Sequence, residues 1–432
     1  GNISLNDSVR ISKTPLKYGG SGIPLKEGQI FVLEDLIKAS AVYSANNATY
    51  AIAEYVGEGS VFNFVAKMNK KLKILLYIVI IGLGYGVGTL IGYYAGKQLS
   101  SQEATNIYLI IVILLFGIIL QIIIHEAGHL FFGLLCGYKF ISFKVFNFAI
   151  VKDEENKIKF KIIQGTKGTA GQCLMEPPKL ENGTFPYKLY LAGGVLFNII
   201  FSLLGWIIAP SIYMLIFVLI GLVFAITNAI PMGFNDGMSF KLCLRSEINR
   251  YAIHLSLVSA AYATQGKSYV VEHPEVLEKI RNLRVKETTH ITDYLKFLEI
   301  EYNQDKFEFK KVYAGLLKLY LENPDLILPY KIEVMRSLVM FASFFEPKSE
   351  IVEKLMKDKH VSARLKAKEP QNKIILAVYE WRVKNNPQKA LAILEEGRKI
   401  LYRSPHLYAK IIDEKYINYI ESLIISEIEQ KI

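Results

Sequence analysis

Apolar residues in the first 240 positions gather into four long runs that are separated by polar, Lys-rich stretches. A helix needs about 20 mainly apolar residues to cross a hydrocarbon core roughly 30 Å thick. The runs are therefore predicted to be four membrane spans, within a membrane-embedded core over residues 67–240. Their approximate bounds are 74–96, 107–136, 189–209 and 212–230.

Lysines flank these runs unevenly. Four lysines lie between residues 67 and 73, before the first run, and six lie between 139 and 161, after the second. Positively charged loops tend to stay in the cytoplasm, so both flanks are predicted to be cytoplasmic. The expected location is the cell membrane, as a multi-pass protein with both termini in the cytoplasm.

The net charge of +11 allows two interpretations. One is a nucleic-acid-binding protein. The other is a membrane protein with basic cytoplasmic flanks. Because the lysines cluster beside apolar runs, the second is favoured. The lipid bilayer is therefore an expected partner, and nucleic acid is not.

Residues 140–162, between the second and third spans, have the pattern of strands. Residues 157–162 alternate strictly between basic and apolar side chains, and Asp153 to Asn156 form a turn signal. This predicts a cytoplasmic β-hairpin with one apolar and one basic face. Two roles are open for it. Either one of its strands, or the stretch Gly165 to Gly171 that follows it, lies beside the metal site and accepts an extended substrate as an added strand, or the hairpin rests its apolar face on the membrane.

After about residue 240 the chain takes on the apolar spacing of amphipathic helices. Three segments, 290–321, 329–356 and 371–401, each hold two apolar stretches with a polar break between them. The breaks recur at about 40 residues, as in helical-repeat solenoids. Residues 241–432 are therefore predicted to form a cytoplasmic, solenoid-like domain that binds a protein partner. An irregular helical domain is the alternative.

The first 66 residues are mixed in composition and carry no clear functional signal. Two short amphipathic helices are predicted there, over 30–39 and 61–68, and are expected to lie on the membrane surface. The fold expected for the whole chain is mainly α. It combines a four-span membrane core, a β-hairpin insertion and a helical-repeat-like C-terminal domain.

The second apolar run contains His125-Glu126-Ala127-Gly128-His129, which has the form H-E-x-x-H. Residues four apart share one face of a helix, so both imidazoles can reach one metal ion, and Glu126 can act as a general base on a metal-bound water. Ionisable residues inside a membrane span are costly and usually functional. A structural polar cluster is the alternative.

A catalytic zinc site needs a third protein ligand. The best candidate is Asp236, which follows the fourth run in the sequence Asn228 to Gly237. Pro231 and Gly233 should end the helix and let Asp236 turn inward. The alternative role for Asp236 is a helix cap at the membrane surface.

These residues resemble the site-2 protease family of intramembrane metalloproteases. The resemblance lies in H-E-x-x-H and N-x-x-P-x-x-x-x-D-G on two predicted spans, within about residues 107–237. Gly194 to Asn198 is similar to the family's G-P-x-x-N element, with Val195 in place of proline. Asn235 also departs from the family, which usually has an apolar residue there.

The resemblance implies a role for each of six residues and one Zn²⁺ ion as cofactor. His125, His129 and Asp236 would be metal ligands, and Glu126 would be the catalytic base. Asn198 and Asn228 would hold the substrate or stabilise an oxyanion. Hydrogen bonding between helices is the alternative role for these two asparagines.

The sequence-based hypothesis is a zinc-dependent intramembrane endopeptidase. It would cleave a membrane-associated or transmembrane protein or peptide near the cytoplasmic side of the bilayer. The competing hypothesis is a non-catalytic membrane receptor or scaffold, with a structural metal site and a partner-binding helical domain.

Overall fold

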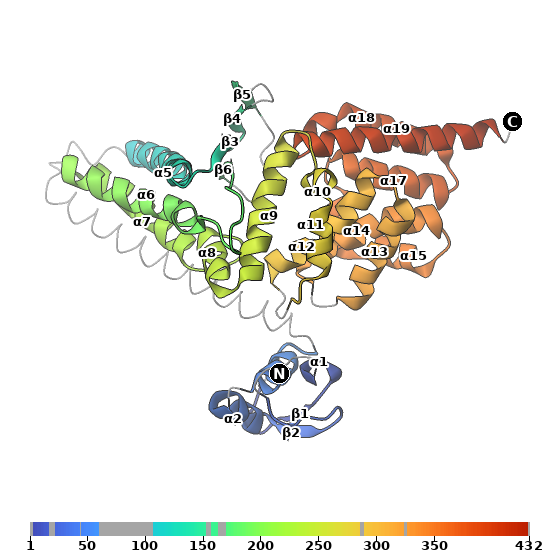
Figure 1. Cartoon of the computed structure of the whole chain (residues 1–432), viewed down its shortest axis with the longest axis horizontal. Helices are drawn as coiled ribbons and strands as arrows, with labels where there is room; N and C mark the ends of the chain where they lie inside the picture. The colour runs from blue at the N-terminus through green and yellow to red at the C-terminus, as the bar shows by residue number, and fades with distance from the viewer. Residues whose placement is uncertain are drawn as a thin grey trace. The chain divides into compact units, whose positions relative to one another are not determined.

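The computed structural model describes residues 3–16, 22–43, 45–59, 107–152, 157–162, 170–285, 289–323 and 326–430. These residues are mainly helical with two small β-sheets, and the chain divides into two compact units, Gly1–Gln98 and Leu99–Ile432 (Figure 1). The first predicted span, 74–96, and the predicted helix at 61–68 lie outside the described residues.

The first unit has a small core of its own. Two short antiparallel strands pair, and the apolar faces of two helices pack on them through residues such as Leu36 and Ala48, both fully buried. The predicted helix at 30–39 begins instead as a strand, because Ile30–Val32 pairs with Ser8–Arg10. The elements are β1 (Ser8–Arg10), α1 (Lys13–Leu16), β2 (Ile30–Val32), α2 (Leu33–Tyr43) and α3 (Asn46–Val56).

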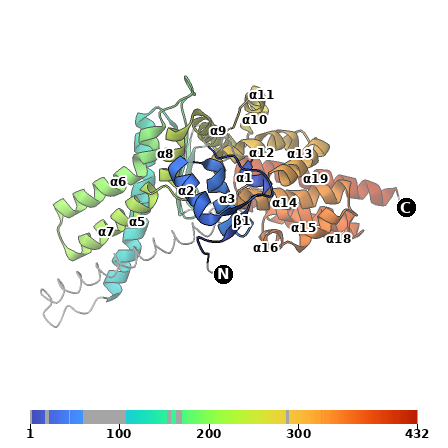
Figure 2. The same cartoon turned by 90° about the horizontal axis from the view of Figure 1, so that it is seen from below.

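Three long apolar helices begin the second unit and pack against one another at the end far from the C-terminus (Figures 1 and 2). They are α5 (Ile107–Leu135), α6 (Tyr187–Ile208) and α7 (Ile212–Ala229). They coincide with the last three predicted spans. By length and composition, Val112–Leu135 and Tyr187–Ile208 could cross a membrane, and Tyr213–Ala229 is a shorter apolar helix. The described residues thus contain two candidate spans, fewer than the four predicted.

Glycines allow α5 and α6 to touch through their backbones. A Cβ atom on Gly128 would lie 2.2 Å from the carbonyl oxygen of Gly193, and one on Gly193 would lie 2.5 Å from that of Gly128. Small residues permit this approach, which lets polar groups of the two helices meet. The polar residues of α5 therefore face α6 across a backbone-to-backbone contact.

A four-stranded antiparallel sheet in the order β5-β4-β3-β6 follows α5. The predicted hairpin is present as β4 paired with β5, but the segment before it is not one strand. The chain turns at Phe146, whose φ is 52°, and so gives both β3 and β4. The strands are β3 (Lys139–Val145), β4 (Phe148–Lys152), β5 (Ile158–Ile162) and β6 (Gly171–Glu176).

Two helices connect this part to the rest of the unit. α8 (Asp236–Arg245) packs on α6, and α9 (Glu247–Thr264) packs on both α8 and β6. The short helices α10 (Tyr269–Glu272) and α11 (Glu275–Arg281) follow. The start of α8 is thereby held beside α6 and α7, which positions Asp236.

The remaining helices form the predicted pairs, stacked side by side (Figure 1). Their polar breaks fall within a few residues of the predicted positions. Buried residues such as Leu316, Leu338 and Ile417 form one continuous core along the stack. The helices are α12 (His290–Asp305), α13 (Phe309–Glu322), α14 (Leu328–Phe345), α15 (Glu350–Lys357), α16 (Lys359–Leu365), α17 (Pro370–Arg382), α18 (Pro387–Lys399) and α19 (Leu407–Glu429), with a 3-10 turn at Leu401–Arg403.

Candidate metal centre

One face of α5 is polar although the helix is apolar overall. Gln121, His125 and His129 follow at intervals of four residues, so they line one stripe of the helix. All three are buried, with 0%, 8% and 6% of their surface exposed. Buried polar side chains need hydrogen-bond partners or a ligand. The partners of this stripe therefore indicate what it does.

Asp236 reaches the stripe from the first turn of α8. The loop after α7 bends at Gly233, whose φ is 60°. Asn235 caps α8, because its side chain accepts a hydrogen bond from the backbone N–H of Met238 at 2.9 Å. The capping role considered for Asp236 thus belongs to Asn235. The Asp236 Oδ2 atom lies 3.0 Å from Nε2 of His125 and 3.3 Å from Nε2 of His129.

The other ring nitrogen of each histidine is already hydrogen bonded. Nδ1 of His129 lies 2.7 Å from the carbonyl oxygen of Tyr190, which can only accept. Nδ1 of His125 lies 2.7 Å from Oδ1 of Asn198. Both Nδ1 atoms are therefore assigned as donors, and in a neutral ring this leaves both Nε2 atoms as acceptors.

Three acceptor atoms consequently face one another. The two Nε2 atoms are 3.3 Å apart, and each lies within 3.3 Å of the Asp236 carboxylate. No donor comes from the three residues themselves, so a proton or a cation is needed to offset the repulsion. A tetrahedral ion with bonds of about 2 Å places its ligands roughly 3.3 Å apart, so the spacing fits such an ion. Among the described residues, this is the group that could hold a metal ion.

The Asp236 carboxyl suits a cation ligand electrostatically. Burial raises its pKa, but the neighbouring His129 and His125 lower it by more when their rings carry the shared proton, so the pKa lies below its usual value. The carboxyl is therefore ionised at neutral pH. One ionised carboxylate and two imidazoles form a donor set that divalent transition-metal ions accept.

Glu126 lies beside this cluster, facing the sheet edge. It is buried, and its Oε2 atom accepts a hydrogen bond from the backbone N–H of Cys173 in β6 at 2.7 Å. Gly171 provides the space, because a Cβ atom there would lie 2.6 Å from Oε1 of Glu126. The edge strand β6 therefore fixes the carboxyl group of Glu126.

Asn198 connects His125 to a chain of buried polar groups. Its Nδ2 atom donates to the backbone oxygen of Gln121 at 3.0 Å and to the side-chain oxygen at 2.7 Å. Gln121 in turn donates to Oγ of Ser202 and to the carbonyl oxygen of Phe217, both at 3.2 Å. Asn198 thus bridges α5 and α6 and is fully buried.

Gln121 and the β6 residues after Gly171 were not among the residues that the sequence analysis selected. The signal for Gln121 was present, since it lies one helical turn before His125 in an apolar run. The contact of β6 with Glu126 depends on strand pairing over a long sequence separation, which no local pattern predicts. The sequence therefore indicated the metal-ligand candidates but not what orients them.

A cavity of about 700 Å³ opens at the cluster. His125, Glu126, His129 and Asp236 line one side, and residues 170–174 line another. Asn228 also lines it, and its Nδ2 atom donates to the backbone oxygen of Phe224 in its own helix at 3.0 Å. Asn198 is absent from the described lining. The two asparagines that were predicted together therefore occupy different places.

Comparison with known proteins gives a match at the other end of the chain. The model of a D-alanyl-D-alanine carboxypeptidase family matches residues 1–76. D-alanyl-D-alanine carboxypeptidase DacF of Bacillus subtilis (strain 168) is 41% identical over 73 residues, which are 17% of this chain and 18% of the relative. The chain therefore spans about a fifth of the length of that relative. No solved structure matches the chain.

These matches correct the predicted family. Over residues 1–76 they point to a serine peptidase family, whereas the prediction was the site-2 protease family. The prediction relied on a few motif positions between residues 107 and 237, and the residues of the first unit, which carry the match, were assigned no function. The matched segment ends before α5, so the histidine cluster lies outside it.

The predicted activity and cofactor are corrected by the same finding. Serine peptidases use a side-chain hydroxyl as nucleophile and need no catalytic zinc. The zinc-dependent intramembrane endopeptidase, its Zn²⁺ cofactor and the alternative of a non-catalytic receptor are therefore not the functions that the matches indicate.

Proposed function

We propose that the second unit is a membrane-associated hydrolase that binds one divalent cation through His125, His129 and Asp236. The observation that carries the proposal is the convergence of three acceptor atoms within 3.3 Å of one another, inside a buried cluster. In this proposal α5 and α6 cross the bilayer, and the cluster opens to the cavity of about 700 Å³. A bound divalent cation would lower the pKa of a water molecule and polarise a bond to oxygen.

The residues of the chain supply the remaining chemistry. Glu126 accepts a proton from a water molecule in the cavity. The backbone N–H of Cys173 binds its Oε2 atom and not its Oε1 atom, so Oε1 is the atom that takes the proton. Asn198 orients His125 through its Nδ1 atom, and Tyr190 orients His129. Asn228, on the cavity wall, contacts the substrate.

The test measures metal binding separately from hydrolysis. The full chain is purified, and metal content and hydrolysis of a panel of fluorogenic esters and amides are measured together. Glu126→Gln should keep about one metal ion per chain and lose hydrolysis by at least about 100-fold, because a positioned proton acceptor contributes that much. An unchanged rate in a metal-loaded Glu126→Gln variant would rule out the proposed role.

A second candidate function comes from the first unit. Its match to a D-alanyl-D-alanine carboxypeptidase favours hydrolysis of a peptide that ends in D-alanyl-D-alanine. Within this unit a cavity of about 790 Å³ is lined by polar residues including Arg10, Ser12 and Glu54, and Ser12 donates to Glu54 at 2.6 Å. This cavity is a place where such a peptide could bind.

Release of D-alanine from such a peptide measures this second activity directly. If the first unit catalyses it, release should continue in Glu126→Gln and after chelation of metal ions. If release stops in both cases, the activity belongs to the cluster in the second unit. No release by the wild-type chain would remove the second candidate.

A further inference from the structure

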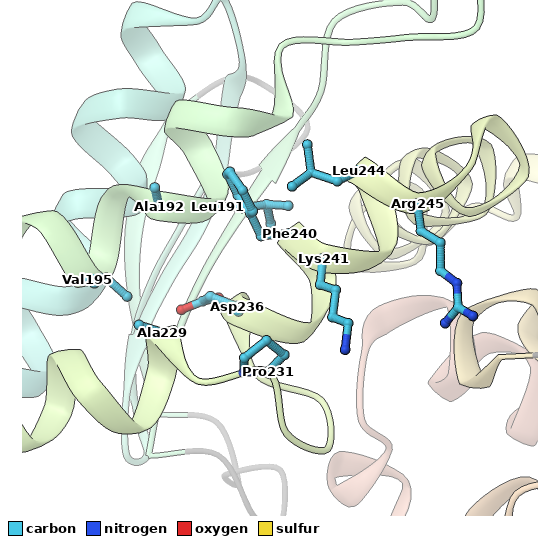
Figure 3. A pocket seen from close by; sticks show the side chains of 11 residues that line it. Leu191, Ala192, Val195, Ala229, Pro231, Asp236, Phe240, Lys241, Leu244 and Arg245 are labelled. Carbon is cyan, nitrogen blue, oxygen red and sulfur yellow. The ribbon is translucent and has the colours of Figure 1, made fainter. Parts of the chain in front are cut away.

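A second cavity, of about 560 Å³, borders the first one. Leu191 and Asp236 line both cavities, so the second reaches the histidine cluster from another side. Apart from Asp236 and two basic residues its lining is apolar or glycine, and it includes Ala192, Val195, Ala229 and Phe240 (Figure 3). A volume of this size is typical of sites for small organic molecules.

The cavity lies where two of the apolar helices, α6 and α7, have their ends. Leu191 and Val195 lie near the start of α6, and Ala229 is the last residue of α7. Large apolar side chains nearby are exposed, including Phe234 at 64% and Leu244 at 56%. If α6 spans a bilayer, its first turns lie at the level of the lipid headgroups. The cavity is then open to lipid chains and close to lipid headgroups.

Two basic side chains also line this cavity. Lys241 and Arg245 are four residues apart on α8, so they share one face of the helix. Figure 3 shows both side chains pointing to the same side of α8, away from Leu191 and Ala192. Asp236, which lines both cavities, would repel an anion from the part of the cavity next to the histidine cluster. The charges therefore fit a ligand whose apolar part is inside and whose anionic part is at Lys241 and Arg245.

We propose that this cavity binds an acyl chain of an anionic phospholipid, whose phosphate contacts Lys241 and Arg245. An acyl chain needs no hydrogen-bond partner in an apolar cavity. A peptide segment would bury N–H and C=O groups there, and the mostly apolar wall offers them few partners. This inference rests on the part of the proposed function in which α6 crosses a bilayer, but not on hydrolysis, because none of the residues to be varied belongs to the histidine cluster.

The test uses the purified full chain in detergent, titrated with phosphatidylglycerol or phosphatidylcholine of identical acyl chains, and native mass spectrometry to count bound lipid. Phosphatidylglycerol should bind more tightly. The double variant Lys241→Gln/Arg245→Gln should lose about 30-fold in its affinity, because each basic residue near a membrane surface contributes about fivefold. The matched control Lys179→Gln/Lys188→Gln removes the same charge outside the cavity and should bind like wild type.

A third variant tests the apolar part. Ala192→Phe fills the cavity and should reduce binding of both lipids, and an unchanged thermal unfolding midpoint would show that the variant is still folded. Equal binding of the two lipids by wild type, an equal loss in the control pair, or an apolar peptide at this site in place of lipid would each overturn the proposal.

Discussion

Two clusters of buried polar side chains in the second unit differ in how their charges are matched. In the helical stack, Arg336 is 3% exposed and donates to Asn372 at 2.9 Å, to Gln371 at 2.7 Å and to Glu333. In this cluster the donors of Arg336 therefore meet acceptors. In the histidine cluster, the two Nε2 atoms and a carboxylate oxygen meet as three acceptors.

This difference separates a structural cluster from a ligand site. Polar groups that satisfy one another hold elements together, as Arg336 holds α14 to α17 through Gln371 and Asn372. Acceptors that converge without a donor are unfavourable by themselves and become favourable with a cation. Burial of polar residues alone therefore does not indicate a ligand site. A ligand site is indicated when the buried polar groups repel one another in the absence of a cation.

The largest expected effect is the loss of metal from a ligand variant. His129→Ala should weaken metal binding by more than about 100-fold, because residues that merely orient a ligand already contribute 10- to 100-fold. Titration of the metal-free chain measures this. His254→Ala is the matched control, since His254 is also buried but bonds to the carbonyl oxygen of Pro178. Equal losses in the two variants would mean that the effect comes from unfolding.

A smaller loss should follow from crowding a ligand. A Cβ atom on Gly194 would lie 2.4 Å from Cε1 of the His125 ring, which Asn198 holds in place. Gly194→Ala should therefore move the ring and reduce metal affinity by up to roughly 100-fold. Gly205→Ala is the control, because its Cβ would meet only the flexible Met214 side chain at 2.7 Å. An unchanged metal affinity in Gly194→Ala would show that metal binding does not depend on the position of the His125 ring.

The sequence predicted elements better than it predicted their contacts. Apolar periodicity located α5, α6, α7 and the helix pairs of the C-terminal stack, because burial of an apolar face leaves a repeating signal. The turn at Phe146 was missed because the residues on both sides suit a strand equally well. In the first unit, Ile30–Val32 was taken as helix although pairing with Ser8–Arg10 makes it a strand.

The site was predicted in part for the same reason. His125 and His129 are found from spacing on one helix, but the place of Asp236 depends on how the loop after α7 folds. The position of Gly171 against Glu126 depends on the pairing of β6 with β3. The roles of Glu126 and Asn228 remain proposals. The first unit, which carries the family match, offered no periodic signal from which that match could be inferred.

The structural cluster should respond in stability and not in metal binding. Arg336→Ala leaves Asn372 and Gln371 without their buried donor, so we expect a loss of about 2 kcal/mol in the free energy of unfolding. Denaturant titration of the full chain measures it. Arg281→Ala, which removes a surface pair with Glu299, should cost less than about 1 kcal/mol. A reduced metal affinity in Arg336→Ala would contradict the separation of the two clusters.

The last expected effect is a pH dependence in the stack. Burial raises the pKa of Asp413 from 3.8 to about 6, although Ser404 and Arg336 act against it. The folded chain then binds this proton more tightly than the unfolded chain, so stability falls as pH rises from about 4 to about 6 and is level above. The shift of about two pKa units corresponds to a change of about 3 kcal/mol. Asp413→Asn should remove this slope from the free energy of unfolding, and an unaltered slope would exclude Asp413 as its source.

The most direct test is to locate the cation itself. Crystals of the full chain, loaded with a divalent first-row transition metal, would be measured on both sides of the absorption edge of that metal. The account predicts one anomalous peak, bounded by Nε2 of His125, Nε2 of His129 and the carboxylate of Asp236. A metal-loaded crystal without a peak between these atoms would mean that the cluster shares a proton and binds no metal.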